Sequence, residues 1–358
     1  MGLPFFSGQS KRRDQIIAID LGGRTTKAVY LQRQGDGFSL GDYAVMDTPV
    51  YEKAMSAEVL VEHLKTVSRA LNSGKAKQVT LALGVAETLF RQVELPLMAT
   101  GDMRLMLKYN SKTYLQQDLP DHVFDCYYSP PNRQSKPAEA PKSGSGPAKH
   151  KVMVGGAKRK TIDDLQAAIR AAGLIADQIV PSMIGPANAF EMTEPEVFAK
   201  EVVALVDIGF KNSTITILDS GEIILNRVVA IGGDRFTSGL AESMNISYIE
   251  AESIKVGMPT EVQQSLEPLI HPLGRELRAS IDFFENQQDK TVSHVFVSGG
   301  SARSDFIILA LQNELMVTCK SWNPTGFLQM GLDPQKMGQI EQVAPQLTVA
   351  IGAAAAAF

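Results

Sequence analysis

The sequence is poor in cysteine and has no long hydrophobic run. Cys126 and Cys319 lie far apart, without metal-type spacing or a disulfide framework, so we expect no zinc site and a reducing compartment. No stretch approaches the roughly 20 consecutive apolar residues that a membrane-spanning helix needs. The first residues lack the charged segment and long apolar run of a signal peptide. These absences predict a cytoplasmic protein.

An excess of one charge is also missing. The 35 lysines and arginines against 39 aspartates and glutamates give a formal net charge of −4, which favours neither nucleic acid nor an anionic membrane as a partner. The five histidines are scattered and are expected to be structural or solvated. A chain of 358 residues is too long for one typical core and suits two lobes.

One short phrase occurs twice in the chain. Residues 16–22 and 203–209 are apolar, β-branched runs that end in Asp-aliphatic-Gly, and each is followed by a turn and a second strand. This pattern predicts two β-hairpins. A single such turn is more often a plain hairpin, so only the order of several such parts along the chain points to a function. Further glycine turns follow at 232–233 and 299–301, and a small-residue helix is predicted over 348–357.

The chemistry of these turns suits a polyphosphate. Backbone N–H groups and neighbouring hydroxyls bind phosphate oxygens, and a carboxylate at the strand end suits a hydrated magnesium ion. A buried aspartate is costly unless it has such a partner. Two similar hairpins therefore predict two similar halves that hold one polyphosphate between them.

This order of parts resembles the actin-like ATPase superfamily, which includes actin, the sugar kinases, the heat-shock chaperones, FtsA and PilM. Residues 20–27 and 207–214 resemble its two phosphate loops, and residues 295–303 its adenosine motif. Residues 187–190 and the helix containing Gly352 resemble its two connecting helices. The resemblance covers residues 14–358 and implies an α/β fold of two RNase H-like lobes, over 15–190 and 191–358. Residues 1–14 are predicted to be a flexible tail, either a frayed terminus or a small docking element.

The segment from about 88 to 180 narrows the resemblance. It is predicted to form strand, helix, strand, loop, strand and helix, and its Pro/Ser/Gly/Lys-rich loop over 129–150 is predicted to be disordered. FtsA and PilM insert a subdomain at this point, and the phrases at 93–98, 171–174 and 232–234 are similar to PilM. The alanine-rich C-terminal segment lacks the basic amphipathic helix of FtsA.

The resemblance implies ATP and Mg²⁺ as cofactors. Asp20 and Asp207 are expected to hold the magnesium through water. Glu252 and Lys255 match contacts to ribose and adenine, although a solvated ion pair within one helix is an equal alternative. The remaining expected nucleotide contacts are the glycines, hydroxyls and basic residues of the turns: Gly22, Gly23, Arg24, Thr25, Thr26, Lys27, Gly209, Asn212, Ser213, Thr214, Gly232, Gly233, Gly299, Gly300 and Ser301.

Two positions depart from the family pattern. Arg24 and Phe210 stand where small residues are usual, so Arg24 either contacts phosphate or crowds the pocket. The first connecting helix carries Asn188, and no carboxylate is evident that would orient an attacking water, which in-line hydrolysis needs. We expect nucleotide binding with slow or absent hydrolysis, and we assign no catalytic residue.

The PilM resemblance implies a cytoplasmic ATP-binding adaptor of a type IV pilus or type II secretion-like machine. Such a protein forms a ring or other homo-oligomer beneath the inner membrane and reaches the membrane through its partner. It binds the N-terminal peptide of a PilN-like membrane protein in a groove between the inserted subdomain and the first lobe, here around residues 85–107. The alternatives are an FtsA- or MreB-like filament former and, with no clear aspartate base, a small-molecule kinase.

Overall fold

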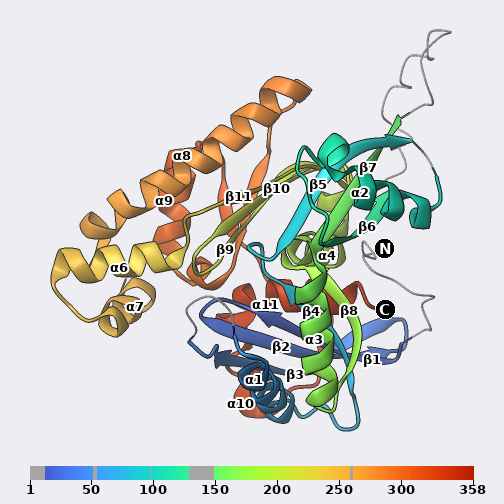
Figure 1. The fold of residues 1–358 in the computed structure, drawn as a ribbon. Coiled ribbons are helices and arrows are strands. Elements are labelled where there is room, and N and C mark those ends of the chain that lie inside the picture. Colours follow the sequence, from blue (N-terminus) through green and yellow to red (C-terminus); the bar gives the residue numbers. More distant parts are fainter. Residues whose placement is uncertain (1–12, 51–54, 97, 129–148, 259–260) are drawn as a thin grey trace.

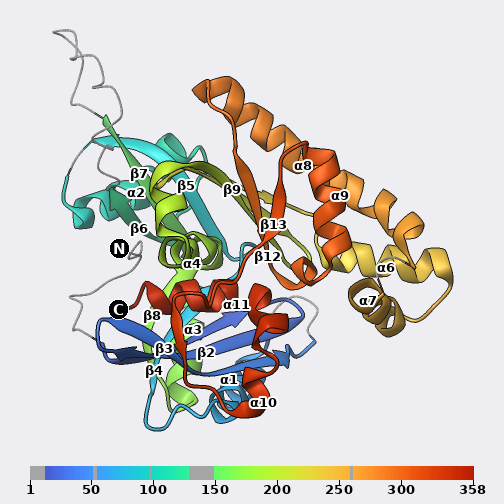
Figure 2. The same cartoon turned by 180° about the vertical axis from the view of Figure 1, so that it is seen from behind.

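The computed structural model describes residues 13–50, 55–96, 98–128, 149–258 and 261–358. It has two lobes with a third, smaller unit on the first lobe (Figures 1 and 2). The predicted tail and the predicted disordered loop lie outside the described residues, apart from 13–14 and 149–150.

The first lobe is built on a six-stranded sheet. Its strand order is β14-β3-β2-β1-β4-β8, with bounds Leu328–Met330, Gly37–Asp47, Thr25–Gln34, Gln15–Leu21, Gln78–Leu83 and Ile175–Pro181. Alternate residues of β1 face opposite layers: Ile17 and Ile19 pack toward α1 (Ala57–Ala70) and α3 (Arg159–Ala171), and Ile16 and Ala18 toward α11 (Ile340–Ala355). Burial on both faces explains why this strand has almost no polar residue before Asp20.

The second lobe repeats the same local topology. Its five-stranded sheet has the order β11-β10-β9-β12-β13, with bounds Glu222–Val229, Ser213–Asp219, Val202–Ile208, His294–Ser298 and Cys319–Ser321. In the first lobe β1 pairs antiparallel with β2 and parallel with β4, and here β9 pairs antiparallel with β10 and parallel with β12. The two predicted hairpins are therefore confirmed as equivalent parts of two similar lobes.

Helices complete the second lobe. They are α5 (Pro195–Lys200), α6 (Gly233–Met244), α7 (Tyr248–Gly257), α8 (Gln263–Gln288), the short η2 (Gly300–Arg303) and α9 (Asp305–Leu315). The apolar side chains of α8 and α9 share one core with the strands, including Leu277, Ile281 and Leu311. Figure 1 shows α6 and α7 together at one end of this lobe, at the left of the view.

The inserted unit has its own sheet and core. Strands β5 (Thr88–Pro96), β7 (Lys149–Lys158) and β6 (His122–Tyr128) form a sheet of that order, covered by α2 (Thr100–Leu115) over Leu95, Leu107 and Phe124. The predicted order of elements is as observed. We placed the end of the unit near residue 180, but α3 and β8 pack in the first lobe, so its sheet ends at Lys158.

The C-terminal segment crosses back to the first lobe, although we assigned 191–358 to the second. Strand β14 pairs with β3, and Lys336 of α10 (Pro334–Met337) donates hydrogen bonds to Asp42 and Tyr43. Helix α11 then packs along β1 and β2 and against α4 (Gly185–Thr193), which follows the short η1 (Ser182–Ile184). The region of contact between these sequence-distant segments is visible in Figure 2.

The crossing of α4 and α11 depends on two glycines. A Cβ atom at position 352 would lie 1.8 Å from the carbonyl oxygen of Gly185, and one at position 185 would lie 2.8 Å from that of Val349. The backbones therefore approach more closely than side chains permit. Both predicted connecting helices are confirmed, and they meet beneath the cleft between the lobes. Within the described residues, no helix combines the length and hydrophobicity that crossing a membrane requires.

Candidate nucleotide site between the lobes

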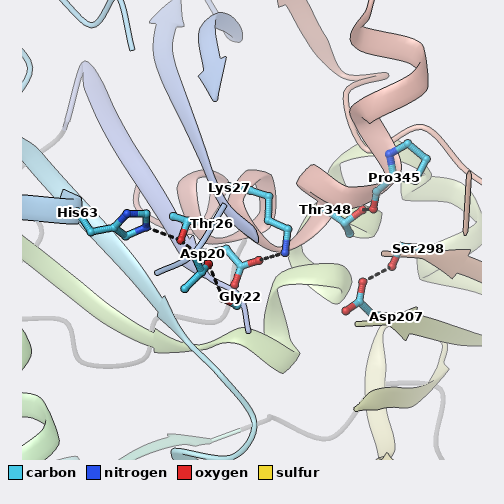
Figure 3. A network of polar contacts seen from close by, with 10 residues as sticks. Asp20, Gly22, Thr26, Lys27, His63, Asp207, Ser298, Pro345 and Thr348 are labelled. Atoms are coloured by element: carbon cyan, nitrogen blue, oxygen red, sulfur yellow. Dashed lines mark hydrogen bonds and ion pairs between the residues drawn. The ribbon is translucent and has the colours of Figure 1, made fainter. Parts of the chain in front are cut away.

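Two carboxylates face each other where the equivalent hairpins of the two lobes meet (Figure 3). Asp20 is the penultimate residue of β1 in the first lobe, and its Oδ2 lies 3.3 Å from Lys27 Nζ on the returning strand β2. Asp207 stands near the end of β9 in the second lobe and accepts a hydrogen bond of 2.9 Å from Ser298 on β12. The sequence repeat thus places one carboxylate and one hairpin turn on each wall.

The first turn is packed tightly around its glycine. A Cβ atom at position 22 would lie 2.4 Å from the carbonyl oxygen of Thr25 and 2.6 Å from Lys27 Nζ. The carbonyl oxygen of Gly22 accepts a hydrogen bond of 2.8 Å from the Thr48 hydroxyl, and Thr48 N donates to Arg24 O at 2.8 Å. Thr48, the residue after β3, therefore bonds the turn at Gly22 and at Arg24. We did not predict a role for this residue.

Thr26 lies on the other face of the hairpin. Its hydroxyl is buried and bonded to His63 Nε2 at 2.7 Å and to Thr48 Oγ1 at 3.0 Å. Side chains alternate along a strand, so Thr25 and Lys27 share the cleft side while Thr26 points toward α1. The structure assigns the Thr26 hydroxyl to support of the turn, in contrast to the phosphate contact that we expected.

Beside the second turn, burial is the main influence on the pKa of Asp207. Burial raises the pKa of Asp207 to about 6, against the opposing effects of the Ser298 hydrogen bond and the charge of Lys27. The charge of Asp20 acts in the same direction as burial and raises the pKa of Asp207 further. A cation between them would relieve this repulsion. Among the described residues no group of three His, Cys, Asp or Glu side chains could hold a metal alone, so magnesium would need water and phosphate oxygens as further ligands.

In the second lobe, as in the first, some of the predicted residues form the turn and others have side chains that bond inward, away from it. Gly209 N donates to Asn212 O at 3.0 Å, which closes the turn, while the buried Ser213 hydroxyl donates to Ile231 O at 2.7 Å. The Ser213 side chain therefore lies away from the cleft. Thr214 is also buried and pairs with Asp207 across the hairpin.

Three glycines let the second-lobe turns approach one another. A Cβ atom would lie 2.3 Å from Phe210 O at position 232, and 2.4 Å from Ile208 O at position 299, where φ is +92°. At position 233 it would lie 2.6 Å from Ser301 Oγ and 3.6 Å from Lys255 Nζ. The glycine turns at 232–233 and 299–301 are thus brought together beside Lys255, whereas Gly300 has open space around it.

Glu252 and Lys255 form an ion pair within α7 that is buried on one side, because the side chain of Lys255 is 3% exposed and that of Glu252 is 34% exposed. Lys255 is buried, and its ammonium donates to Glu252 Oε2 at 2.7 Å and to Thr237 Oγ1 at 2.8 Å. Burial lowers the pKa of Lys255, and the neighbouring Glu252 opposes that shift. For Glu252, burial acts upward on the pKa, but Lys255 and the Thr237 hydroxyl lower it overall. The buried Lys255 ammonium, held by Glu252 and Thr237, thus has a fixed position beside the glycine turn at 233.

Arg24 reaches from the first lobe to the second. Its guanidinium carbon lies 5.0 Å from the ring centre of Tyr248 and 5.9 Å from that of Phe210. Gly23 lies against Phe210 as well, since a Cβ atom there would be 3.5 Å from its ring. The two positions that depart from the family pattern are therefore in contact with each other.

A separate groove lies between the inserted unit and the first lobe. It has a volume of about 500 Å³, and its walls are Arg104 of α2, residues 123–124 of β6, Arg159, Ile162, Asp163 and Gln166 of α3, and residues 176–179 of β8. Strands β6 and β8 are the outer strands of their sheets. Two strand edges therefore border one groove, and such edges carry backbone groups that can pair with an extended chain.

The groove has polar groups of both signs. Arg104 is held by Asp125 through hydrogen bonds of 2.6 and 2.9 Å. Arg13 bonds Asp177 Oδ1, while the other oxygen of Asp177 and the amide oxygen of Gln178 are buried without a hydrogen-bond partner among the described residues. The predicted surface at 85–107 contributes Arg104, but no local pattern indicated that α3 and β8 would line the groove, because their position depends on long-range packing.

Comparisons with known proteins agree with this architecture. Residues 18–358 match the family model described as type IV pilus assembly protein PilM. A solved PilM-PilN type IV pilus biogenesis complex contains a chain that is 22% identical, with a TM-score of 0.79 and coverage of 96% of this chain and 98% of that one. EutJ, an ethanolamine utilization protein from Carboxydothermus hydrogenoformans, is 15% identical, with a TM-score of 0.57 over 97% and 91% of the two chains. MreB5 of Spiroplasma citri, solved with AMPPNP, is 11% identical, with a TM-score of 0.52 over 96% and 95%.

Proposed function

Because the chain belongs to the PilM family of type IV pilus assembly proteins, we propose that it is a nucleotide-binding adaptor of such a machine. In this proposal it binds ATP with Mg²⁺ between its lobes and a membrane partner's peptide in the groove beside β8. It works in the cytoplasm as a homo-oligomer or ring and reaches the inner membrane through the partner. The observation that carries the proposal is the pair of hairpins that brings Asp20, Lys27 and Asp207 together.

The residues of the cleft fit a magnesium nucleotide. Lys27 and the turns of 22–25 and 209–212 would bind the phosphates, and Asp20 and Asp207 would hold the metal through water. The turns at 232–233 and 299–301, with Glu252 and Lys255, would hold the nucleoside. MreB5 of Spiroplasma citri, a structure of the same fold, was solved with AMPPNP, which supports nucleotide binding by a chain of this fold.

Hydrolysis is not part of the proposal. Asn188 of α4 is buried at the helix crossing, where its Nδ2 lies 3.5 Å from the carbonyl oxygen of Gly352. Its side chain therefore contributes to the packing of α4 against α11. We assign no water-orienting group and no base for a kinase reaction.

The nucleotide part is tested by titrating a fluorescent ATP analogue with Mg²⁺ against the native chain and Asp20→Ala. We expect the substitution to weaken binding by tenfold or more, because one of the two metal-facing carboxylates and the partner of Lys27 are lost. Asp219→Ala is a matched control, because Asp219 pairs with Lys290 at the far end of β10. Equal affinity in native chain and Asp20→Ala would exclude the proposed site.

The partner part concerns the groove. The PilM-PilN complex shows that a chain of this fold assembles with PilN, and the two strand edges beside Arg104 suit an extended peptide. We expect Ile162→Glu, within the groove, to weaken binding of a PilN-like N-terminal peptide at least tenfold. Ala167→Glu, exposed on the same helix, should bind as the native chain does. Fluorescence anisotropy of a labelled peptide measures both, and equal losses would place the peptide elsewhere.

An FtsA- or MreB-like filament is the alternative in which the same nucleotide site controls polymerisation. Sedimentation of the full chain with and without ATP and Mg²⁺ separates the two. Nucleotide-dependent pelleting together with failure of peptide binding would favour the filament.

A further inference from the structure

We propose that Arg24 is a strap between the lobes: its guanidinium, seated on Tyr248 and Phe210, holds the mouth of the cleft closed and sets the rate at which nucleotide enters and leaves. The inference rests on the proposed nucleotide site and adds a residue that controls access to it. The strap is defined here as Arg24, Phe210 and Tyr248.

The strap joins three elements that are distant in sequence. Arg24 belongs to the β1–β2 turn of the first lobe, Phe210 to the β9–β10 turn of the second, and Tyr248 begins α7. A guanidinium within about 6 Å of an aromatic ring centre is attracted by the negative face of the ring, and here two rings share one guanidinium. The contact therefore stabilises the closed arrangement of the lobes.

Both sides of the strap are held in place. The carbonyl oxygen of Arg24 accepts a hydrogen bond of 2.8 Å from Thr48 N, and the hydroxyl of Tyr248 donates to Asp234 Oδ1 at 2.9 Å. Phe210 is fixed through its carbonyl oxygen, which accepts from Asp234 N at 2.9 Å. A contact between two anchored turns resists opening more than one between flexible side chains.

The guanidinium of Arg24 lies in a different part of the interface between the lobes from Lys27, the proposed phosphate-binding cation. The charges that act on Asp207 come from Lys27 and Asp20, whereas the charge of Arg24 acts on Glu252, Lys255 and Tyr248. Arg24 therefore lies on the nucleoside side of the cleft, and Lys27 lies between the carboxylates. This distribution favours a closing contact over the phosphate contact that the sequence left open.

The first test measures the lobes without nucleotide. Spin labels at Arg69→Cys on α1 and Glu242→Cys on α6, both exposed positions, report the distance between the lobes in the full chain by pulsed electron resonance. We expect Arg24→Ala and Tyr248→Leu to broaden and lengthen the distribution. Tyr248→Phe keeps the ring but loses the Asp234 hydrogen bond, so its distribution should lie between those of the native chain and Tyr248→Leu.

The second test measures the kinetics of a fluorescent ATP analogue by stopped flow. We expect Arg24→Ala to raise both the association and the dissociation rate constants by about three- to tenfold, so that Kd changes little. Combining it with Tyr248→Leu should add almost nothing, because both substitutions remove the same contact.

Two results would overturn the strap. Slower association with a large loss of affinity in Arg24→Ala would make Arg24 a phosphate ligand. Native distances in both Arg24→Ala and Tyr248→Leu would mean that the contact does not hold the lobes. If the native chain binds no nucleotide, the nucleotide proposal fails, and the distance measurement still decides whether the strap closes the cleft.

Discussion

At the scale of single residues, the two hairpins carry polar groups that interact between the lobes and polar groups that hold the turns. Lys27, Asp20 and Asp207 interact across the opening, while Thr26 and Ser213 bond inward to His63 and Ile231. Both types look alike in the sequence, since each is a polar residue in or beside a turn. The period-2 alternation of β2 distinguishes them, because it puts Thr25 and Lys27 on one face and Thr26 on the other.

His63 should make the stability of the first lobe depend on pH. Burial lowers the pKa of His63 below its usual value near 6.5, so the folded protein takes up this proton less readily than the unfolded chain. The contribution of neutral His63 to stability is therefore fully present above pH 6.5 and declines as the pH falls below that value. We expect His63→Gln, which cannot titrate, to flatten the decline in melting temperature between pH 7.5 and 5.

Thermal unfolding of both proteins across this pH range measures the effect. A slope unchanged by His63→Gln would mean that the buried imidazole does not govern acid sensitivity.

At the scale of elements, the helices and strands that could be predicted from the sequence are those that a local residue pattern specifies. The hairpins, α1 and the strand-helix-strand order of the inserted unit follow from turn glycines and from hydrophobic periods of 2 and 3.6 residues. The return of the chain to the first lobe was not predictable in this way. Strand β14 has only three residues and pairs with β3, which lies almost 300 positions earlier, so no local pattern specifies the partner.

The crossing of α4 and α11 gives an element-scale prediction. We expect Gly352→Ala to destabilise the protein by about 2 kcal/mol or more, because the new methyl group would overlap the carbonyl oxygen of Gly185. Gly101→Ala in the exposed first turn of α2 meets no atom within 4 Å and should change stability by no more than about 1 kcal/mol, toward greater stability. Denaturant unfolding measures both, and equal effects would contradict the tight crossing.

At the scale of the whole molecule, the two lobes share one apolar core, which contains Ile16 and Ala18 of β1, Val203 and Leu205 of β9, and residues of the connecting helices α4 and α11. Helix α11 touches both: it packs along β1 and β2, and its Pro345 carbonyl oxygen accepts from Gly299 N at 2.8 Å in the second lobe. Figure 3 shows Pro345 and Thr348 beside the two carboxylates. A ligand that bridges the carboxylates would therefore act where the lobes meet the connecting helices.

We expect ATP with Mg²⁺ to narrow the distance distribution between the labels on α1 and α6, because a bridged cleft permits fewer lobe angles. Asp20→Ala should not respond, since it lacks the carboxylate and the partner of Lys27 that the bridge needs. Peptide affinity measured on the same samples, with and without ATP and Mg²⁺, tests whether the nucleotide site controls the groove. If saturating nucleotide altered neither distance nor peptide affinity, the control of docking by nucleotide would be lost, although both sites could still bind.

The route of the chain from groove to hinge has a thermodynamic consequence. Strand β8 borders the groove and ends at Pro181, and the chain passes through η1 directly into α4, which crosses α11 at Gly185. The strand that borders the groove and the helix that crosses α11 below the Asp20–Asp207 site are thus one continuous segment. Linkage between two sites is reciprocal, so a peptide whose binding is strengthened by nucleotide must strengthen nucleotide binding by the same factor. In a ring of such chains, engagement of the membrane partner would retain nucleotide in the engaged subunits and let the others exchange it.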